Sequence, residues 1–309
     1  MIDGKQMKKT GYASDPVFLK HHIAPGHPET PDRIKFIDTA MRESGLSPQL
    51  EKIDLKRDVL EWIKTVHSEE HIQSIQTNTP IAYEVAQAAV GASLSAIDHI
   101  ASGNLKNAFC AIRPPGHHAL NTGREEGFCY FNNIAIAARY AQKQYGLKRV
   151  LIVDWDYHHG NSTEAVFYED PGVLYFSTHD QFAYPGTGDP KKKGLGPGLG
   201  YNINVHLPCG TDDKTIIDVF ESILIPAANE FKPDIVLISA GFDSREDDLL
   251  GCFNVTDSGF SILTDKVMQI ADQYCDGRLV SLLEGGYNLS GNAKAVVSHV
   301  RTLSGGQQN

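Results

Sequence analysis

The sequence has no long apolar run. Of its 309 residues 41% are hydrophobic, yet no stretch approaches the roughly 18 consecutive apolar residues of a membrane span. The N-terminal segment MIDGKQMKKTGYASD also lacks the apolar core of a signal peptide. We find no internal repeat, low-complexity tract or linker. These absences predict a soluble, cytoplasmic globular protein without a membrane attachment.

Cysteine is scarce as well. The sequence holds five cysteines and no CxxC pair, and this odd number argues against a disulfide framework and a structural zinc knuckle. We therefore expect reduced, buried thiols in a reducing compartment. The five are Cys110, Cys129, Cys209, Cys252 and Cys275.

Positive charge is in the minority. The sequence has 28 Lys and Arg against 38 Asp and Glu, a formal net charge of -10. A strongly acidic protein is a poor partner for a phosphate backbone or an anionic membrane, so we expect no direct nucleic-acid binding.

Two common catalytic signatures are missing. There is no GxSxG nucleophile elbow. The run KKKGLGPGLG at 191–200 lacks the Gly-Lys-Ser/Thr ending of a phosphate loop, so we interpret it as a surface loop. Histidine, by contrast, is plentiful at 13 residues, and it serves metal binding and proton transfer near neutral pH.

Apolar runs alternate with helical patterns along most of the chain. This alternation predicts an α/β fold with a mostly parallel central sheet and helices on both faces. Because it continues from about residue 109 to the C-terminus without a break in composition, we expect one domain over 1–309. The first hundred residues are expected to be helix and loop. Strands are expected at 109–112, 149–153, 173–177, 201–205, 234–239 and 278–283, and helices at 31–44, 83–101, 132–145, 212–231, 256–276 and 290–303.

Polar clusters directly follow four of these expected strands. They occupy residues 113–118, 154–161, 240–243 and 284–287. Ligands of open parallel sheets bind outside the carboxyl ends of the strands. The four clusters therefore predict one shared site.

The second cluster predicts a metal site. In an extended segment, residues two apart point the same way, so Asp154, Asp156 and His158 are expected to share a face. Asp243, after a neighbouring strand, can supply a third ligand. Three protein ligands with an open fourth position are typical of a catalytic site for Zn²⁺, Fe²⁺ or Mn²⁺. A helix-capping Asp and a hydrogen-bonded core His are the structural alternative.

The other clusters supply groups for acid–base chemistry. The adjacent His117 and His118 suit general acid–base work beside a metal, with Asp154 and Asn161 as the partners that fix their tautomers. Tyr287 follows two glycines and can donate its hydroxyl to an oxyanion. Each feature alone also fits a plain surface turn.

Taken together, the motifs resemble the zinc-dependent histone deacetylase family, in particular its class II branch and bacterial relatives that include acetylpolyamine amidohydrolases. The resemblance covers most of the chain and implies the arginase/deacetylase-like α/β fold. It rests on His22 and on HPETPDR (27–33), RPPGHHA (113–119), GFCYFNN (127–133), DWDYHHGN (154–161), STHD (177–180), YPGTGD (184–189), SAGFDS (239–244) and EGGY (284–287).

This resemblance implies a role for each site residue. His118 would act as general base and then as acid, with His117 as its electrostatic partner buttressed by Asp154. Asn161 stands where some members have Asp, which looks like class II. Tyr287 would polarise the acetyl carbonyl. One Zn²⁺ would be held by Asp156, His158 and Asp243.

The resemblance also implies a substrate tunnel and structural K⁺. Gly127 and Phe128 would line the tunnel, with Tyr184 and Leu250 near its walls. One K⁺ site would match Asp154, Asp156, His158, Ser177 and Thr178, and a second Phe167, Asp170, Val173 and Tyr201.

The implied reaction is hydrolysis of an acylated lysine side chain, in a peptide or protein, or of a similar acylated amine. The chain departs from the family at Ser244, where members often read Asp-Ala-His, and at Tyr184, where histone-directed members often have Phe. Polyamine-directed members can carry Glu near Leu250, so Leu250 favours acyl-lysine. The alternatives are an acetylpolyamine or small-amide amidohydrolase, a binuclear-manganese ureohydrolase and a non-catalytic binder of acylated ligands.

Overall fold

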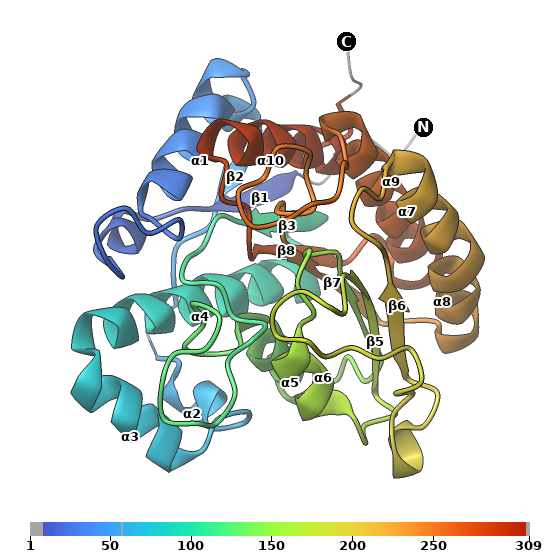
Figure 1. Ribbon diagram of the computed structural model, residues 1–309, viewed down its shortest axis with the longest axis horizontal. Coiled ribbons are helices and arrows are strands. Elements are labelled where there is room, and N and C mark those ends of the chain that lie inside the picture. Colours follow the sequence, from blue (N-terminus) through green and yellow to red (C-terminus); the bar gives the residue numbers. More distant parts are fainter. Residues whose placement is uncertain (1–8, 57, 307–309) are drawn as a thin grey trace, which may run out of the picture.

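An all-parallel sheet forms the centre of the molecule. The structure is a computed structural model, which describes residues 9–56 and 58–306. Within these residues eight strands form one sheet in the order β2-β1-β3-β8-β7-β4-β5-β6, and every neighbouring pair is parallel (Figure 1). The strands are β1 (Thr10–Ala13), β2 (Glu51–Lys52), β3 (Asn107–Cys110), β4 (Val150–Asp154), β5 (Val173–His179), β6 (Asn202–His206), β7 (Ile235–Ala240) and β8 (Leu279–Leu283).

Helices cover both faces of the sheet. On one face α1, α9 and α10 pack together, and on the other α4 packs with α5 (Figure 1). This arrangement confirms the predicted α/β fold with a parallel sheet between two helical layers. The helices are α1 (Asp32–Glu43), α2 (Leu60–Ile63), α3 (Glu69–Asn78), α4 (Pro80–Ala101), α5 (Asn133–Tyr145), α6 (Asn161–Phe167), α7 (Asp213–Val219), α8 (Ile225–Phe231), α9 (Asp257–Cys275) and α10 (Leu289–Leu303).

The central strands β4 and β7 are buried along their whole length. Both carry uninterrupted apolar runs, as strands covered on two faces require. Since β3, β8, β7 and β4 are neighbours, their carboxyl ends meet at one edge of the sheet. The four polar clusters predicted from the sequence follow these four strands, so they converge there.

Two predictions about the elements are wrong in detail. The first hundred residues contain two strands, β1 and β2, which were expected to be loop; β1 has only four residues and β2 two. The helix expected over 212–231 is divided into α7 and α8 by a π-helical segment at Phe220–Leu224. The predicted single domain of residues 1–309 includes residues 1–8, 57 and 307–309, which lie outside the described residues.

Among the residues that are described, no helix is both long and apolar enough to cross a membrane.

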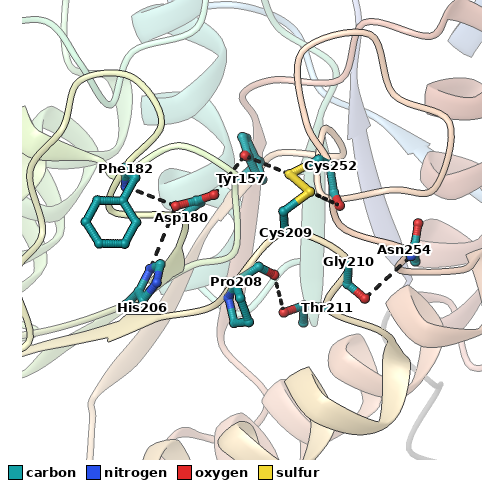
Figure 2. Close-up of a disulfide and its surroundings, with 10 residues drawn as sticks. All are labelled: Tyr157, Asp180, Phe182, His206, Pro208, Cys209, Gly210, Thr211, Cys252 and Asn254. Atoms are coloured by element: carbon teal, nitrogen blue, oxygen red, sulfur yellow. Dashed lines mark hydrogen bonds and ion pairs between the residues drawn. A yellow bond between two sulfur atoms is a disulfide. The ribbon is translucent and has the colours of Figure 1, made fainter.

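The expectation of five reduced thiols is wrong for one pair. Cys209 and Cys252 form a disulfide with Cα atoms 5.1 Å apart, 43 residues apart in sequence. The pair joins the turn after β6 to the loop that follows Asp243, and the Tyr157 hydroxyl lies 3.2 Å from the Cys252 sulfur (Figure 2). The other three cysteines are free and buried, as expected.

Candidate active site

Three side chains at the converging strand ends form a compact metal-ligand group. Asp156 and His158 follow β4, and Asp243 follows β7; one ligand atom from each lies within 4.8 Å of the other two. His158 Nδ1 is 3.2 Å from Asp156 Oδ1 and 3.0 Å from Asp243 Oδ2. One imidazole nitrogen and two carboxylate oxygens make a donor set that suits Zn²⁺ or Fe²⁺.

Backbone N–H groups hold the carboxylates of this triad in place. Asp156 Oδ1 accepts from the N–H of His158 at 2.8 Å, and its Oδ2 accepts from the N–H of Gly285 at 2.8 Å. Asp243 Oδ1 accepts from the N–H of Tyr157 at 2.8 Å. A Cβ on Gly285 would lie 2.1 Å from Asp243 Oδ2, so only glycine lets the β8 loop approach this closely.

The charges of the triad call for a cation. Burial raises the pKa of Asp243, and the carboxylate of Asp156 raises it further. Burial alone would lower the pKa of His158, but hydrogen bonds and charge from the two aspartates raise it to about 10. Two buried carboxylates that repel each other are stabilised by a positive charge between them. The residues present therefore fit a divalent metal ion.

Asp154 does not join this group. The period-two alternation placed it on the same face as Asp156 and His158, but it is the last residue of β4, and the chain leaves strand geometry after it. Its Oδ1 accepts from the N–H of Asp156 at 3.2 Å, while Oδ2 contacts His117 Nδ1 at 3.2 Å and the Tyr175 hydroxyl at 3.0 Å. It serves the neighbouring histidine instead.

The two adjacent histidines lie beside the triad in different environments. Their ring centroids are 4.0 Å apart, and His118 Nδ1 is 2.8 Å from Asn161 Oδ1. Burial lowers the pKa of His118, and the neighbouring His117 and His158 lower it further. Burial would also lower the pKa of His117, but the carboxylates of Asp156, Asp154 and Glu284 raise it to about 10. These surroundings therefore favour the neutral form of His118 and the charged form of His117.

Glu284 is a contributor that the sequence interpretation left without a role. It is fully buried, and its Oε2 accepts from the N–H of Gly116 at 2.6 Å and of His117 at 3.2 Å. It thus anchors the backbone of the histidine pair from the end of β8. Burial raises its pKa to about 7. Its place in the EGGY motif was the available signal, but its contacts depend on how two distant loops meet.

Of the expected tunnel residues, Gly127 and Tyr184 contact His118, and Phe128 contacts Tyr287. The Tyr287 side chain is buried, with the guanidinium of Arg33 5.1 Å from its ring centroid and the Phe128 ring edge-on at 5.9 Å. His118 meets the half-exposed Tyr184 edge-on at 5.0 Å. Gly127 packs between these two rings with φ of 53°, and Leu250 lies exposed on the loop after Asp243.

The residues expected to bind K⁺ fall into two places. Asp154 and Ser177 are paired across β4 and β5, and the hydroxyl oxygen of the next residue, Thr178, is buried without a hydrogen-bond partner among the described residues. The other four are joined through backbone contacts around α6 and the start of β5. The N–H of Asp170 donates to Phe167 O, that of Val173 to Asp170 O, and that of Tyr175 to Tyr201 O.

Comparison with known protein families identifies the family to which this chain belongs. The family model of the histone deacetylase domain matches residues 27–303, which is most of the chain. The chain belongs to the histone deacetylase family. The family predicted from the motifs is thereby confirmed.

Curated relatives of this histone deacetylase family member share its sequence over most of the chain. It is 38% identical over 297 residues to a probable deacetylase of Archaeoglobus fulgidus, an alignment that covers 91% of this chain and 82% of the relative. It is 37% identical to histone deacetylase 9 of Homo sapiens over 96% of this chain, which corresponds to only 34% of the human protein. It is 36% identical to the chloroplastic histone deacetylase 10 of Oryza sativa subsp. japonica, over 92% and 71% of the two chains.

The fold agrees with this assignment. The crystal structure of the HDA15 HD domain superposes with a TM-score of 0.91 at 34% sequence identity, covering 98% of this chain and 90% of that one. The protein is thus an enzyme of the deacetylase and amidohydrolase class, as predicted. Acetylated compounds are the substrates that membership of this family implies.

Proposed function

We propose that this deacetylase removes acetyl or related acyl groups from lysine side chains or similar amines, with one Zn²⁺ per chain. The observation that carries the proposal is the meeting of the Asp156, His158 and Asp243 triad with the histidine pair at one edge of the sheet. His118 and His158 have ring centroids 6.2 Å apart, so the proposed base lies next to the proposed metal.

A bound Zn²⁺ or Fe²⁺ would polarise the amide carbonyl and acidify water at the open position of the triad. The protein's own contribution starts with His118. With Asn161 Oδ1 facing its ring, Nδ1 carries the proton and Nε2 is free to accept one. The lowered pKa keeps this ring neutral at pH 7, as a general base must be. The same nitrogen can then return the proton to the leaving amine.

His117 and Tyr287 complete the proposed chemistry. The positive charge on His117, held by Asp154, favours negative charge that develops on the substrate beside it. Tyr287 would donate its hydroxyl to the oxyanion, and one such donor contributes roughly 3 kcal/mol to lowering the barrier. Burial raises the pKa of Tyr287 well above its usual range, so the hydroxyl keeps the proton it donates.

We propose that the substrate enters past the residues expected to line the tunnel. Gly127 packs against His118, Phe128 meets the Tyr287 ring edge-on, and Tyr184 and Leu250 are exposed. This lining suits an extended acyl-amine chain, and an apolar Leu250 favours acyl-lysine over a polycationic acetylpolyamine. An acetylpolyamine or small amide is the alternative substrate within the same family. The absence of direct nucleic-acid binding and a cytoplasmic location stay predictions from charge and composition.

We also propose that K⁺ has a structural role at the two places described above. The Thr178 hydroxyl, which has no hydrogen-bond partner in the described part of the chain, and the pairing of Asp154 with Ser177 across β4 and β5 support the first site. The second, at Phe167, Asp170, Val173 and Tyr201, rests on family resemblance and on carbonyl groups that keep a second lone pair free.

Two other functions are less well supported. A binuclear-manganese ureohydrolase needs further carboxylates in DxHxD and DxD patterns, and this chain has Gly160 two residues after His158 and Arg245 two residues after Asp243. In the described part of the chain a single group of three metal-ligating side chains is found. A non-catalytic binder has no need of His118 and Tyr287 beside that group.

A kinetic panel tests the proposal. The purified protein is assayed for amine release from acetyl-lysine peptides, longer acyl-lysine peptides, acetylpolyamines and small amides. We expect the highest kcat/KM with an acyl-lysine peptide, and Tyr287→Phe should lower kcat by orders of magnitude at unchanged metal content. Binding of a hydroxamate without hydrolysis of any panel member would support the non-catalytic alternative.

A further inference from the structure

The loop after Asp243 carries a carboxylate that no proposed step uses. Asp248 Oδ2 accepts from the N–H of Tyr287 at 2.7 Å and from the N–H of Asn288 at 3.1 Å. Its other oxygen accepts from the N–H of Leu250 at 2.9 Å. We propose that Asp248 is a positioning residue that fixes the Tyr287 hydroxyl relative to the metal-ligand loop. The inference rests on the proposed function and adds a residue to it.

Tyr287 depends on such an anchor because of what precedes it. Gly285 and Gly286 have no side chains to pack, and Gly286 has φ of 121°, which only glycine adopts without strain. Tyr287 also precedes Asn288, the N-cap of α10, so helical hydrogen bonds do not hold its peptide group. Its orientation must therefore be set by contacts from other parts of the chain.

The contacts come from two sides. Arg33 Nε donates to the carbonyl of Gly286 at 2.7 Å. Asp248 receives the next two N–H groups. The peptide that carries the Tyr287 side chain is thus held between a cation and an anion. Arg33 also lies over the Tyr287 ring. On the side of the Tyr287 backbone away from Arg33, the contact is the carboxylate of Asp248.

Charge makes the Asp248 contact strong. Hydrogen bonds from N–H groups to a carboxylate are shorter and stronger than those between neutral groups. The carboxylate also lies at the N-terminus of α10, where the helix dipole favours negative charge. Because Asp248 N donates to Arg245 O and its carboxylate holds Leu250, the loop itself is rigid around it. The carboxylate therefore fixes the position of Tyr287 relative to the loop that follows Asp243.

Two neighbouring substitutions separate this role from a general charge effect. Asp248→Asn keeps the size of the side chain but replaces one accepting oxygen with an NH₂ group, so one set of N–H groups loses its acceptor. Asp247→Asn removes the same charge one residue earlier. Asp247 is exposed with φ of 63°, which Asn tolerates, and its contact to the Asn288 side chain uses its backbone carbonyl.

We expect Asp248→Asn to lower kcat at least tenfold with KM within twofold of the wild type. A 1 Å misplacement of a catalytic group can cost on the order of a hundredfold in rate. Metal content should stay near wild type, the thermal unfolding midpoint should fall by no more than a few degrees, and Asp247→Asn should keep kcat within twofold. Asp248→Glu, which retains the charge and moves it by one methylene, should also lower kcat.

A double-mutant cycle with Tyr287→Phe then tests the coupling. A trifluoroacetyl-lysine peptide, with its electron-poor carbonyl, keeps slow variants measurable. When the hydroxyl is gone, Asp248→Asn or Asp248→Glu should cost less than a further threefold. The same loss in both backgrounds, or wild-type kcat in both Asp248 variants, would overturn the inference. A wild-type protein that hydrolyses no acyl-amine would instead overturn the proposed function.

Discussion

Gly127 offers the sharpest structural test of where the active histidine lies. An added Cβ at this position would be 2.4 Å from His118 Cδ2 and 2.8 Å from the Tyr184 ring. Ordinary van der Waals contact begins near 3.4 Å, so Gly127→Ala must displace the His118 ring or the loop by about 1.0 Å. Since Asn161 holds the His118 ring at 2.8 Å, such a shift disturbs the proposed base directly.

A matched control is available four residues earlier on the same loop. Gly123 has φ of 77°, compared with 53° at Gly127, so alanine at either position meets the cost of a left-handed backbone, roughly 1–2 kcal/mol. At Gly123, however, the nearest atom to the added Cβ is the Ser74 hydroxyl oxygen at 3.3 Å, and a shift of about 0.1 Å relieves the contact. The two variants therefore share the backbone strain and differ in the overlap with His118.

We expect both variants to lose free energy of unfolding in urea through the shared backbone strain, and Gly127→Ala to lose about 1–3 kcal/mol more because of the overlap. Their activities should differ by on the order of a hundredfold in kcat/KM, because a displacement of about 1 Å at a catalytic group has effects of that size. The assay is hydrolysis of an acetyl-lysine peptide at a saturating metal concentration. If Gly127→Ala were within threefold of Gly123→Ala, His118 would not be the base.

Three further predictions concern the disulfide, the buried histidines and the metal. Cys209→Ser should lower the free energy of unfolding by about 4 kcal/mol under oxidising conditions, because the disulfide closes a loop of 43 residues. In the presence of dithiothreitol the loss should be much smaller. Equal losses in both conditions would contradict the disulfide. Burial lowers the pKa of His299 to about 3, whereas a histidine in the unfolded chain has a pKa near 6.5. The unfolded chain therefore binds more protons than the folded protein as the pH falls. The stability attributable to His299 falls by about 1.4 kcal/mol between pH 7.5 and 5.5. In His299→Gln the fall in unfolding free energy over that range should be smaller by this amount, and an unchanged pH dependence would show that His299 is not held neutral. Asp243→Asn should weaken metal affinity at least tenfold in competition with a chromogenic chelator, whereas unchanged affinity would remove Asp243 from the ligand set.

The sequence predicted the parts of the fold that depend on local patterns. The apolar runs in β4 and β7 indicated buried parallel strands, and the polar residues directly after them indicated the edge at which Asp156 and Asp243 meet. Parallel strands place their carboxyl ends together whatever their order, so this inference did not require the topology.

What the sequence did not predict depends on contacts between distant segments. Strand β1 has four residues and no long apolar run, and it becomes a strand because β3 and β2 lie on either side of it. Cys209 and Cys252 have no spacing that signals a pair. Glu284 and Asp248 look like ordinary acidic residues until the loops meet and their carboxylates receive backbone N–H groups.

Metal titration of the apoprotein tests the central claim most directly. Protein stripped with a chelator and exchanged into metal-free buffer should have no activity on an acetyl-lysine peptide. Activity should then rise linearly with added Zn²⁺ and reach its plateau at one equivalent per chain, with the same endpoint in elemental analysis of the re-dialysed protein. Full activity after chelation, or a plateau that requires two equivalents of metal, would contradict the account.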